Sequence, residues 1–326
     1  MSETVFLTGA TGFVGSHILR ELLDTGYDVR ALHRPARHPE RSERCRTANG
    51  VTWIEGDLER AGDLVGALRG CRYLVHCAAL YSFAPRDRAA SYRINVAGTA
   101  GLMEAAYLAG VERAVLTSSS ATLGHARRSR PADERDYATE DPRDAYHHSK
   151  LLQERAAFAS RLPVVAILPT APVGPGDERP TPTGAMIRTF AQGKMFAKPP
   201  GDGGMNLVAV EDVARAHVAA LERGRAGERY AVGGENLSMD AIWEMLADIT
   251  GVAAPKRRAP YALALAVAQA DALRCRLDAN ATPFAPLEGV RMARERMFVD
   301  DAKARSELGH APSPVRAALE RAVGRS

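Results

Sequence analysis

Apolar and polar residues alternate in blocks through the first half of the chain. Short runs that are almost wholly apolar or β-branched predict buried strands at 4–9, 28–34, 51–58, 73–79, 113–120 and 163–170. Between these runs apolar residues recur at helical spacing, as Val14, Ile18 and Leu22 do, which predicts helices at 13–26, 95–110 and 149–162. Uninterrupted apolar strands separated by helices indicate an α/β fold, a doubly wound parallel sheet covered on both faces.

The pattern changes after Thr170. A segment rich in proline and glycine, 171–184, predicts a loop that leaves the sheet. A strand, helix and strand at 205–234 are expected to return to the main sheet, and the remainder is mostly helical. We therefore predict a sheet domain and a smaller, mostly helical C-terminal substrate-binding lobe, formed by 1–176 plus about 206–235 and by about 177–205 plus 236–326 respectively.

The most apolar stretch of this second part is 261–273. Gln269 and Asp271 interrupt it, and it is too short to cross a bilayer, so we expect a helix packed in the lobe. The N-terminus has no basic segment followed by a long apolar one, so no signal peptide is predicted.

Composition narrows the class of protein. The chain has 326 residues with a net charge of +4, a surplus too small to indicate a nucleic-acid partner by itself. The four cysteines, Cys45, Cys71, Cys77 and Cys275, form no Cys-x-x-Cys pair, which disfavours zinc and a disulfide framework. We expect a protein of a reducing compartment, the cytoplasm, with no metal.

Glycines at 9, 12 and 15 lie between the first predicted strand and the first helix. Glycine lets the backbone turn sharply and approach a pyrophosphate, and a helix N-terminus offers free N–H groups to it. The spacing Gly-x-x-Gly-x-x-Gly differs from the standard Gly-x-Gly-x-x-Gly, and a strand–turn–helix junction without a ligand is the alternative. We favour a Rossmann-type dinucleotide site.

The end of the second strand indicates which dinucleotide binds. NAD sites usually carry an acid there for the ribose hydroxyls, whereas this chain has Arg34 and Arg37. A guanidinium binds the 2′-phosphate of NADP at two points, so NADP(H) is favoured and NAD(H) remains possible. Arginines on a solvated loop are the other interpretation.

Tyr146 and Lys150 stand four apart on a predicted helix and share a face. His147 and His148 are adjacent and point apart, so they cannot chelate one metal ion. A cation beside the tyrosine and an oxidised nicotinamide would favour the phenolate, which makes Tyr146 a usable acid and base near neutral pH. Serines follow the fifth strand, at the sheet edge where such folds bind ligands.

Together these motifs resemble an extended short-chain dehydrogenase/reductase. The stretches TGATGFVG, EGDL, HCAA, RINVAGT, TSSSATLG, YHHSK and LPTAPVGP follow that family's order over residues 1–176. VRALHRP, PTPTG and GERYAVGGENLS are similar to its dihydroflavonol reductase-like branch, and especially to bacterial proteins known as hopanoid-associated sugar epimerases.

The resemblance implies roles for individual residues. Tyr146 would be the catalytic acid/base, Lys150 would lower its pKa and hold the nicotinamide ribose, and Ser119 would be the catalytic hydroxyl, with Ser118 and Ser120 as alternatives. Asn95 would support the active-site helix. The cofactor-binding set would be Gly9, Thr11, Gly12, Phe13, Val14, Gly15, Arg34, Arg37, Asp57, Leu58, Ala78, Ala79, Asn95, Thr117, Tyr146, Lys150, Pro169 and Thr170.

Three functions remain open from the sequence. The first is an NADP-dependent carbonyl reductase or alcohol dehydrogenase acting on a small molecule. The second is a nucleotide-sugar epimerase or dehydratase with tightly bound NAD, for which Arg179, Arg188 or Lys194 would hold the diphosphate. The third is a non-catalytic sensor, which the intact Ser119, Tyr146 and Lys150 disfavour.

A homodimer through helices 95–110 and 145–161 is a further expectation. The substrate pocket has apolar candidates that also suit core packing, namely Tyr81, Phe83, Met186, Phe190 and Met205.

Overall fold

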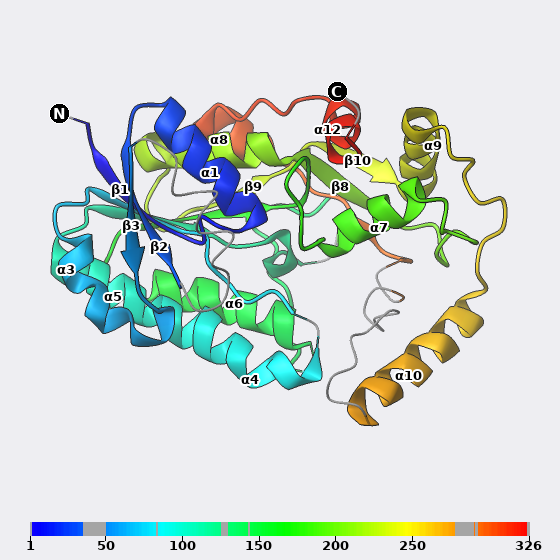
Figure 1. The fold of residues 1–326 in the computed structure, drawn as a ribbon, viewed down its shortest axis with the longest axis horizontal. Coiled ribbons are helices and arrows are strands. Elements are labelled where there is room, and N and C mark those ends of the chain that lie inside the picture. The colour runs from blue at the N-terminus through cyan, green and yellow to red at the C-terminus, as the bar shows by residue number, and fades with distance from the viewer. Residues whose placement is uncertain are drawn as a thin grey trace.

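The computed structural model describes residues 2–34, 50–82, 84–124, 130–142, 144–277, 290 and 293–324. Its main element is a seven-stranded parallel sheet in the order β3-β2-β1-β4-β5-β6-β9 (Figure 1). The strands are β1 (Thr4–Thr8), β2 (Asp28–His33), β3 (Val51–Glu55), β4 (Tyr73–His76), β5 (Arg113–Thr117), β6 (Val164–Pro169) and β9 (Arg229–Val232). The predicted fold class is confirmed.

Helices cover both faces of this sheet. On one face lie α1 (Phe13–Asp24) and α8 (Val210–Arg223), whose apolar residues join those of the strands in one core cluster (Figure 1). On the other face lie α3 (Val65–Leu68), α4 (Arg88–Ser91), α5 (Thr99–Ala109) and α6 (Ala145–Phe158). Residues of β6 are buried throughout, as its run Val-Val-Ala-Ile-Leu-Pro predicts for a strand covered on both sides.

The strand order reverses beside β1, which pairs with β2 on one side and with β4 on the other. In open α/β sheets the two crossovers then leave on opposite faces and open a crevice at the carboxyl ends of these strands. The loops that follow β1, β4, β5 and β6 end at this same edge, so the predicted site segments come together there.

A second, smaller sheet carries the rest of the chain. It joins β10 (Glu235–Ser238), β8 (Gly204–Ala209) and β11 (Arg296–Met297), with β7 (Ala171–Val173) also paired to β8. The helices of this region are α7 (Pro182–Ala191), α9 (Met239–Thr250), α10 (Tyr261–Leu277) and α12 (Val315–Ala322). Phe190 stacks on Trp243 at 5.7 Å between ring centroids in its core.

Three expectations about elements need correction. β8 pairs within the second sheet, whereas β9, from the same predicted strand–helix–strand unit, returns to the main sheet. The segment 171–184 is not all loop, because β7 opens it and α7 begins at Pro182. The described region after residue 234 is mostly helical, as predicted, and also contains the short strands β10 and β11. The helix predicted at 95–110 starts earlier, as a π-helical stretch over Tyr92–Gly98 that leads into α5.

Short helical turns connect the longer elements. Three are of the 3-10 type, at Leu58–Leu64, Pro85–Asp87 and Ser120–Thr122, and a second π-helical stretch covers Ala304–Leu308. Within the described residues, none of the helices has the length and apolarity that crossing a bilayer requires. Arg37, Cys45 and Phe83, named from the sequence, lie outside the described residues.

Candidate active site

The loop between β1 and α1 has glycines at positions where the backbone conformation or the close neighbours leave no room for a side chain. Gly9 has a φ of +79°, in the left-handed region, and a Cβ there would lie 2.7 Å from Ala78 N. A Cβ on Gly15 would lie 2.0 Å from the Gly9 carbonyl oxygen. Gly12 caps α1 without a side-chain bond, so the first N–H groups of the helix keep their capacity for a ligand. The loop therefore fits a pyrophosphate, with Thr11, Phe13 and Val14 beside it.

The ends of β2 and β3 place a cation and an acid side by side. Arg34 Nη1 lies 3.9 Å from Asp57 Oδ2, and both side chains are partly exposed. Asp57 also accepts a hydrogen bond from Glu59 N at 3.0 Å, which caps the short helix that buried Leu58 begins. Arg34 thus lies beside Asp57 at the end of β2, while Arg37 is outside the described residues.

The segment after β4 is fastened to helix α6 through Asn95. Asn95 Oδ1 accepts from Leu80 N at 2.7 Å, and its Nδ2 donates to Leu80 O and to Ser149 Oγ, each at 3.1 Å. Asn95 is fully buried. These bonds tie Leu80, the residue after Ala78 and Ala79, to the helix that carries Tyr146. Thr8 Oγ1 accepts from Ala78 N at 3.1 Å and ties the same segment to β1.

Helix α6 begins at Ala145 because Asp144 caps it, accepting a hydrogen bond from His147 N at 3.1 Å. Lys150 lies one turn after Tyr146 and points into the protein, where its Nζ donates to Thr117 O at 2.9 Å and to Gln153 Oε1. Burial lowers the pKa of Lys150 to about 8, although Cys77 and Glu154 act in the opposite direction. Lys150 is therefore mostly protonated at neutral pH and loses its proton as the pH rises through about 8.

Burial raises the pKa of Tyr146 above its ordinary value, and Asp144 adds to the rise, while a hydrogen bond with the Ser119 side chain opposes it. Within the protein chain, removing the phenolate from water outweighs the hydrogen bond that stabilises it, and the expectation of a lowered pKa beside an oxidised nicotinamide stays a prediction. Tyr146 is consequently protonated at neutral pH, and its hydroxyl is a proton donor that faces Ser119.

The serines after β5 separate clearly. Ser118 is buried and donates to Glu154 Oε2. Ser119 has extended backbone, accepts from Ala121 N at 3.1 Å and hydrogen-bonds Tyr146. The geometry thus favours Ser119 over Ser118 as the hydroxyl beside the tyrosine. Thr117, which precedes them, uses its carbonyl for Lys150 and its Oγ1 for His217 Nε2 at 2.7 Å.

Pro169 and Thr170 complete the edge of the sheet at the end of β6. Pro169 is buried as the last residue of the strand. Thr170 Oγ1 donates to Asn206 Oδ1 at 2.9 Å, and its backbone N donates to Val232 O at 3.1 Å. These bonds connect the end of β6 to both β8 and β9, so the first sheet meets the second one here.

The two histidines after Tyr146 have different partners. His147 Nδ1 contacts Asp144 Oδ2, whereas His148 Nδ1 lies 2.8 Å from Tyr92 Oη. They point apart, as adjacent residues on a helix do. In the part of the chain that the structure describes, no three histidine, cysteine or acidic side chains come together as metal ligands.

Tyr81, an apolar candidate from the sequence, lies directly beside Tyr146. The Tyr81 ring packs edge-on against Tyr146 with centroids 4.4 Å apart, and the residue is 45% exposed. Burial raises the pKa of Tyr81, and the charges of Asp144 and Asp177 add to the rise. Two carboxylates therefore act on the mouth of the site. Of the other apolar candidates, Met186, Phe190 and Met205 belong to the core of the second sheet.

A buried ion pair beneath the site was not predicted from the sequence. Glu154, one turn beyond Lys150 on α6, lies with its Oε1 2.8 Å from Arg229 Nε, and the two side chains are 2% and 4% exposed. The pair is an electrostatic contact, since Arg229 Nε makes no hydrogen bond. Thr122 Oγ1 lies 3.0 Å from Glu154 Oε2 and also accepts from Arg229 Nη2 at 2.9 Å.

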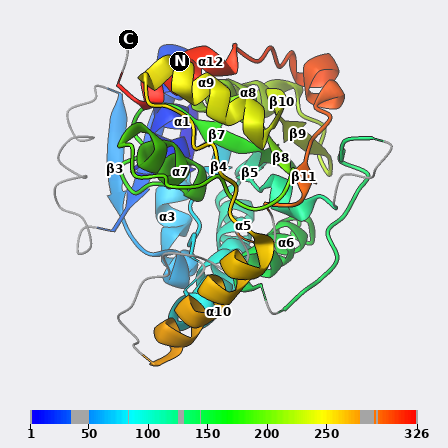
Figure 2. The same ribbon diagram turned by 90° about the vertical axis from the view of Figure 1, so that its right-hand side faces the viewer.

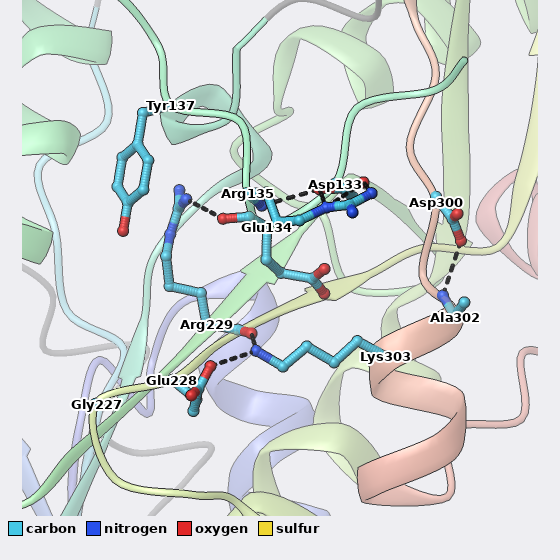
Figure 3. A pocket seen from close by; sticks show the side chains of 10 residues that line it. All are labelled: Asp133, Glu134, Arg135, Tyr137, Gly227, Glu228, Arg229, Asp300, Ala302 and Lys303. Atoms are coloured by element: carbon cyan, nitrogen blue, oxygen red, sulfur yellow. Dashed lines mark hydrogen bonds and ion pairs between the residues drawn. The ribbon is translucent and has the colours of Figure 1, made fainter.

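The same arginine reaches a polar pocket of about 350 Å³ on the other side of the pair. Figure 3 shows its guanidinium beside the Tyr137 ring and the Glu134 carbonyl, to which Nη1 donates at 2.9 Å. The guanidinium carbon lies 4.0 Å from the Tyr137 ring centroid. Arg229 thus ties β9, the loop that holds Ser119 and the loop at 134–137 to helix α6. The helical period places Glu154 on the inward face of α6. Its partner lies 75 residues further along the chain, so the sequence pattern does not identify the pair.

Comparison with known proteins gives consistent results. The model of the NAD-dependent epimerase/dehydratase family matches residues 5–233. A Synechocystis protein with the provisional name dihydroflavonol 4-reductase is 38% identical, over 99% of this chain and 94% of its own. Sterol demethylase protein B of Methylococcus capsulatus is 33% identical, over 98% of this chain and 97% of its own.

Solved structures match over the whole length. The crystal structure of gox2253 has a TM-score of 0.83 and 36% identity, covering 99% of this chain and 97% of that one. MoeE5, solved in complex with UDP-glucose and NAD, has a TM-score of 0.74 and 27% identity, covering 98% of this chain and 97% of that one. Reductase-like and sugar-nucleotide-binding proteins are thus both similar to this chain.

Replacing Glu154 by glutamine keeps the shape of the side chain and leaves Arg229 as a buried cation without its carboxylate. We expect the free energy of unfolding to fall by about 3 to 5 kcal/mol, since breaking a buried pair strands the remaining charge. Urea denaturation measures this change. The pKa of Lys150 should fall as well, because the Glu154 carboxylate raises it.

Arg135→Gln is the matched control for this variant. It breaks a 2.6 Å ion pair with Asp133 in the same pocket, but the Arg135 side chain is 81% exposed (Figure 3). Arg130 still neutralises the buried Asp133 at 3.0 Å in this variant, and the lost guanidinium is exposed, so stability should fall much less than in Glu154→Gln. Equal losses in the two variants would show that burial of the Glu154–Arg229 pair is not what matters.

Proposed function

The chain belongs to the NAD-dependent epimerase/dehydratase family, and from this premise we propose that it is an NADP-dependent oxidoreductase that interconverts a carbonyl and an alcohol on a small molecule. The resemblance to extended short-chain dehydrogenases/reductases is confirmed by these matches. The observation that carries the proposal is the meeting of Ser119, Tyr146 and Lys150 at the sheet edge that also holds the glycine loop.

Each residue has a distinct task in this reaction. The nicotinamide cofactor, when bound, exchanges a hydride with the substrate carbon. Tyr146 gives its hydroxyl proton to the substrate oxygen in reduction and takes a proton from it in oxidation. Ser119 donates a hydrogen bond to the same oxygen, and Lys150, held by Thr117 O, places its charge beside the tyrosine and the ribose. The raised pKa keeps Tyr146 protonated at neutral pH, and the charge of Lys150 together with a bound oxidised nicotinamide would act to lower it.

The remaining cofactor contacts follow from the loops at the crevice. Gly9, Gly12 and Gly15 hold the pyrophosphate, and Asp57 and Leu58 contact the adenine. Ala78, Ala79, Pro169 and Thr170 flank the cofactor, while Asn95 supports the helix that carries Tyr146. Arg34 binds the 2′-phosphate of NADP, and no acid occupies its position at the end of β2. NAD, with which MoeE5 was solved, is the alternative cofactor for this chain.

A nucleotide-sugar epimerase or dehydratase with retained NAD is the second candidate, supported by the likeness to MoeE5 with bound UDP-glucose. Two observations favour the reductase. Asp144 and Asp177 both act on Tyr81 at the mouth of the site, which disfavours a diphosphate there. Arg188, one of the cations considered for that diphosphate, already donates to Asp177 O at 2.8 Å.

We place the substrate pocket between the two sheets. The lobe of about 177–205 and 236–326 forms its outer wall, and the domain of 1–176 and about 206–235 provides the cofactor crevice. The sterol-acting relative suggests an apolar carbonyl substrate. We also propose a homodimer through helices 95–110 and 145–161. Exposed Tyr107 and Leu108 on α5 offer it an apolar contact.

Cofactor preference tests the first part of the proposal. Purified protein should bind NADPH more tightly than NADH, and the bound nucleotide should exchange freely. Arg34→Ala should weaken NADPH about tenfold or more and leave NADH within about twofold, because a charged hydrogen bond to the phosphate is lost. Fluorescence titration of both nucleotides measures this, with Arg60→Ala as control. Tightly retained NAD⁺ in the purified protein would instead support the epimerase.

The catalytic assignment rests on Tyr146. Tyr146→Phe should reduce kcat for NADPH oxidation with a ketone by about a hundredfold to ten-thousandfold while the Kd for NADPH stays the same. Stopped-flow or steady-state absorbance with aliphatic, cyclic and steroidal ketones provides the rates. Tyr107→Phe, on the exposed side of α5, serves as the control. Near-normal turnover by Tyr146→Phe would remove the residue from the mechanism.

A further inference from the structure

Helix α10 presents an aliphatic face to solvent. Leu263 is 59% exposed, Val267 40%, Leu273 56% and Leu277 82%. At about 100° per residue these four side chains fall within an arc of about 120°, and Ala266, Ala270 and Arg274 lie in the same arc, with Arg274 paired to Asp271. The buried residues Ala268 and Asp271 lie outside this arc. α10 is apolar on its inner side as well, where Ala264, Leu265 and Ala268 lie, so it leaves a further part of its apolar surface in water, which a surface helix normally does not do.

The segment that carries this face is basic. Residues 256–277 include one acid, Asp271, and five basic residues, namely Lys256, Arg257, Arg258, Arg274 and Arg276. Lys256 and Arg257 are exposed just before the helix begins. Asp271 is engaged by Arg274 at 2.7 Å and is almost fully buried, so its charge contributes little to the outer surface. The aliphatic face therefore has positive charge beside its N-terminal end, where Lys256 and Arg257 lie.

A second apolar residue stands beside the start of α10. Phe196 is 93% exposed. Lys198, two residues further along the chain, is held against the segment before α10 by two backbone hydrogen bonds. Lys198 N donates to Arg257 O at 2.9 Å, and Ala259 N donates to Lys198 O at 3.0 Å. Phe196 and the aliphatic face thus belong to one region of the surface.

We propose that α10, with Phe196 and the basic residues before the helix, docks the protein on the surface of a bilayer that contains anionic phospholipid. The aliphatic face enters the boundary between headgroups and acyl chains, and Lys256 and Arg257 meet the anionic headgroups. The helix lies on the membrane and does not cross it, since it has 17 residues and about 20 are needed to span.

The charges distinguish this occupant from a second copy of the chain. Two copies joined through α10 would bring two basic segments together, and like charges across an interface oppose association. A bilayer with anionic lipid supplies the complementary sign. Figures 1 and 2 show α10 standing away from both sheets, beyond the carboxyl edge of the main one. Docking there would turn the entrance of the site toward the membrane.

Vesicle binding tests the proposal without any substrate, so its outcome is independent of the proposed reaction. The full chain is sedimented with vesicles of phosphatidylcholine, with and without phosphatidylglycerol. We expect binding to vesicles that contain phosphatidylglycerol, weakening at high salt because exposed charges are screened. Leu263→Glu with Leu273→Glu should weaken binding by about tenfold or more, since two aliphatic side chains that would enter the membrane are lost.

Ala262→Glu with Gln269→Glu is the matched control, because it adds the same two negative charges at exposed positions of α10 outside the aliphatic arc. It should weaken vesicle binding much less. Lys256→Gln with Arg257→Gln should remove the preference for phosphatidylglycerol. Circular dichroism shows whether each variant is folded. The proposal fails if the full chain does not bind either vesicle, if the control weakens binding as much, or if light scattering shows that the α10 variants dissociate a dimer that ignores vesicles.

Discussion

Helix α6 is held in place by charges that the fold has removed from water. Lys150 is satisfied by the Thr117 carbonyl and by Gln153, and Glu154, one turn later, faces Arg229 across 2.8 Å. A buried charge is tolerated only where a partner meets it, so the orientation of the helix is set within narrow limits. Tyr146 lies on the same helix, and its position relative to Ser119 follows from these contacts.

The same contacts connect distant parts of the chain to the site. Arg229 comes from the last strand of the main sheet, and Thr170 links β6 to Asn206 of the second sheet. The glycine loop is closed from the other side, where Ala78 approaches so near that a Cβ on Gly9 would meet it at 2.7 Å. The glycine loop, helix α6 and the second sheet thus meet at one edge, and the proposed reaction would depend on their mutual placement.

The second sheet and its helices combine a packed core with an exposed apolar helix. Phe190 stacks on Trp243 inside the core, while α10 exposes leucines to solvent. An apolar face that the protein leaves uncovered costs free energy in water, so it indicates a partner. The basic residues beside it make anionic lipid the partner that suits it, and a protein with an apolar carbonyl substrate would find that substrate in the same place.

Local patterns in the sequence determined the parallel sheet, the glycine loop and the shared face of Tyr146 and Lys150. These features depend on residues that are close along the chain and on fixed helix and strand periods, so the sequence alone predicts them. Tertiary structure decided the rest. It set Ser119 beside Tyr146 and Ser118 against Glu154, placed β8 in the second sheet, paired Glu154 with Arg229 and raised the pKa of Tyr146 through burial. Each of these outcomes depends on contacts between residues far apart in sequence, and on desolvation, which exists only once the chain has folded.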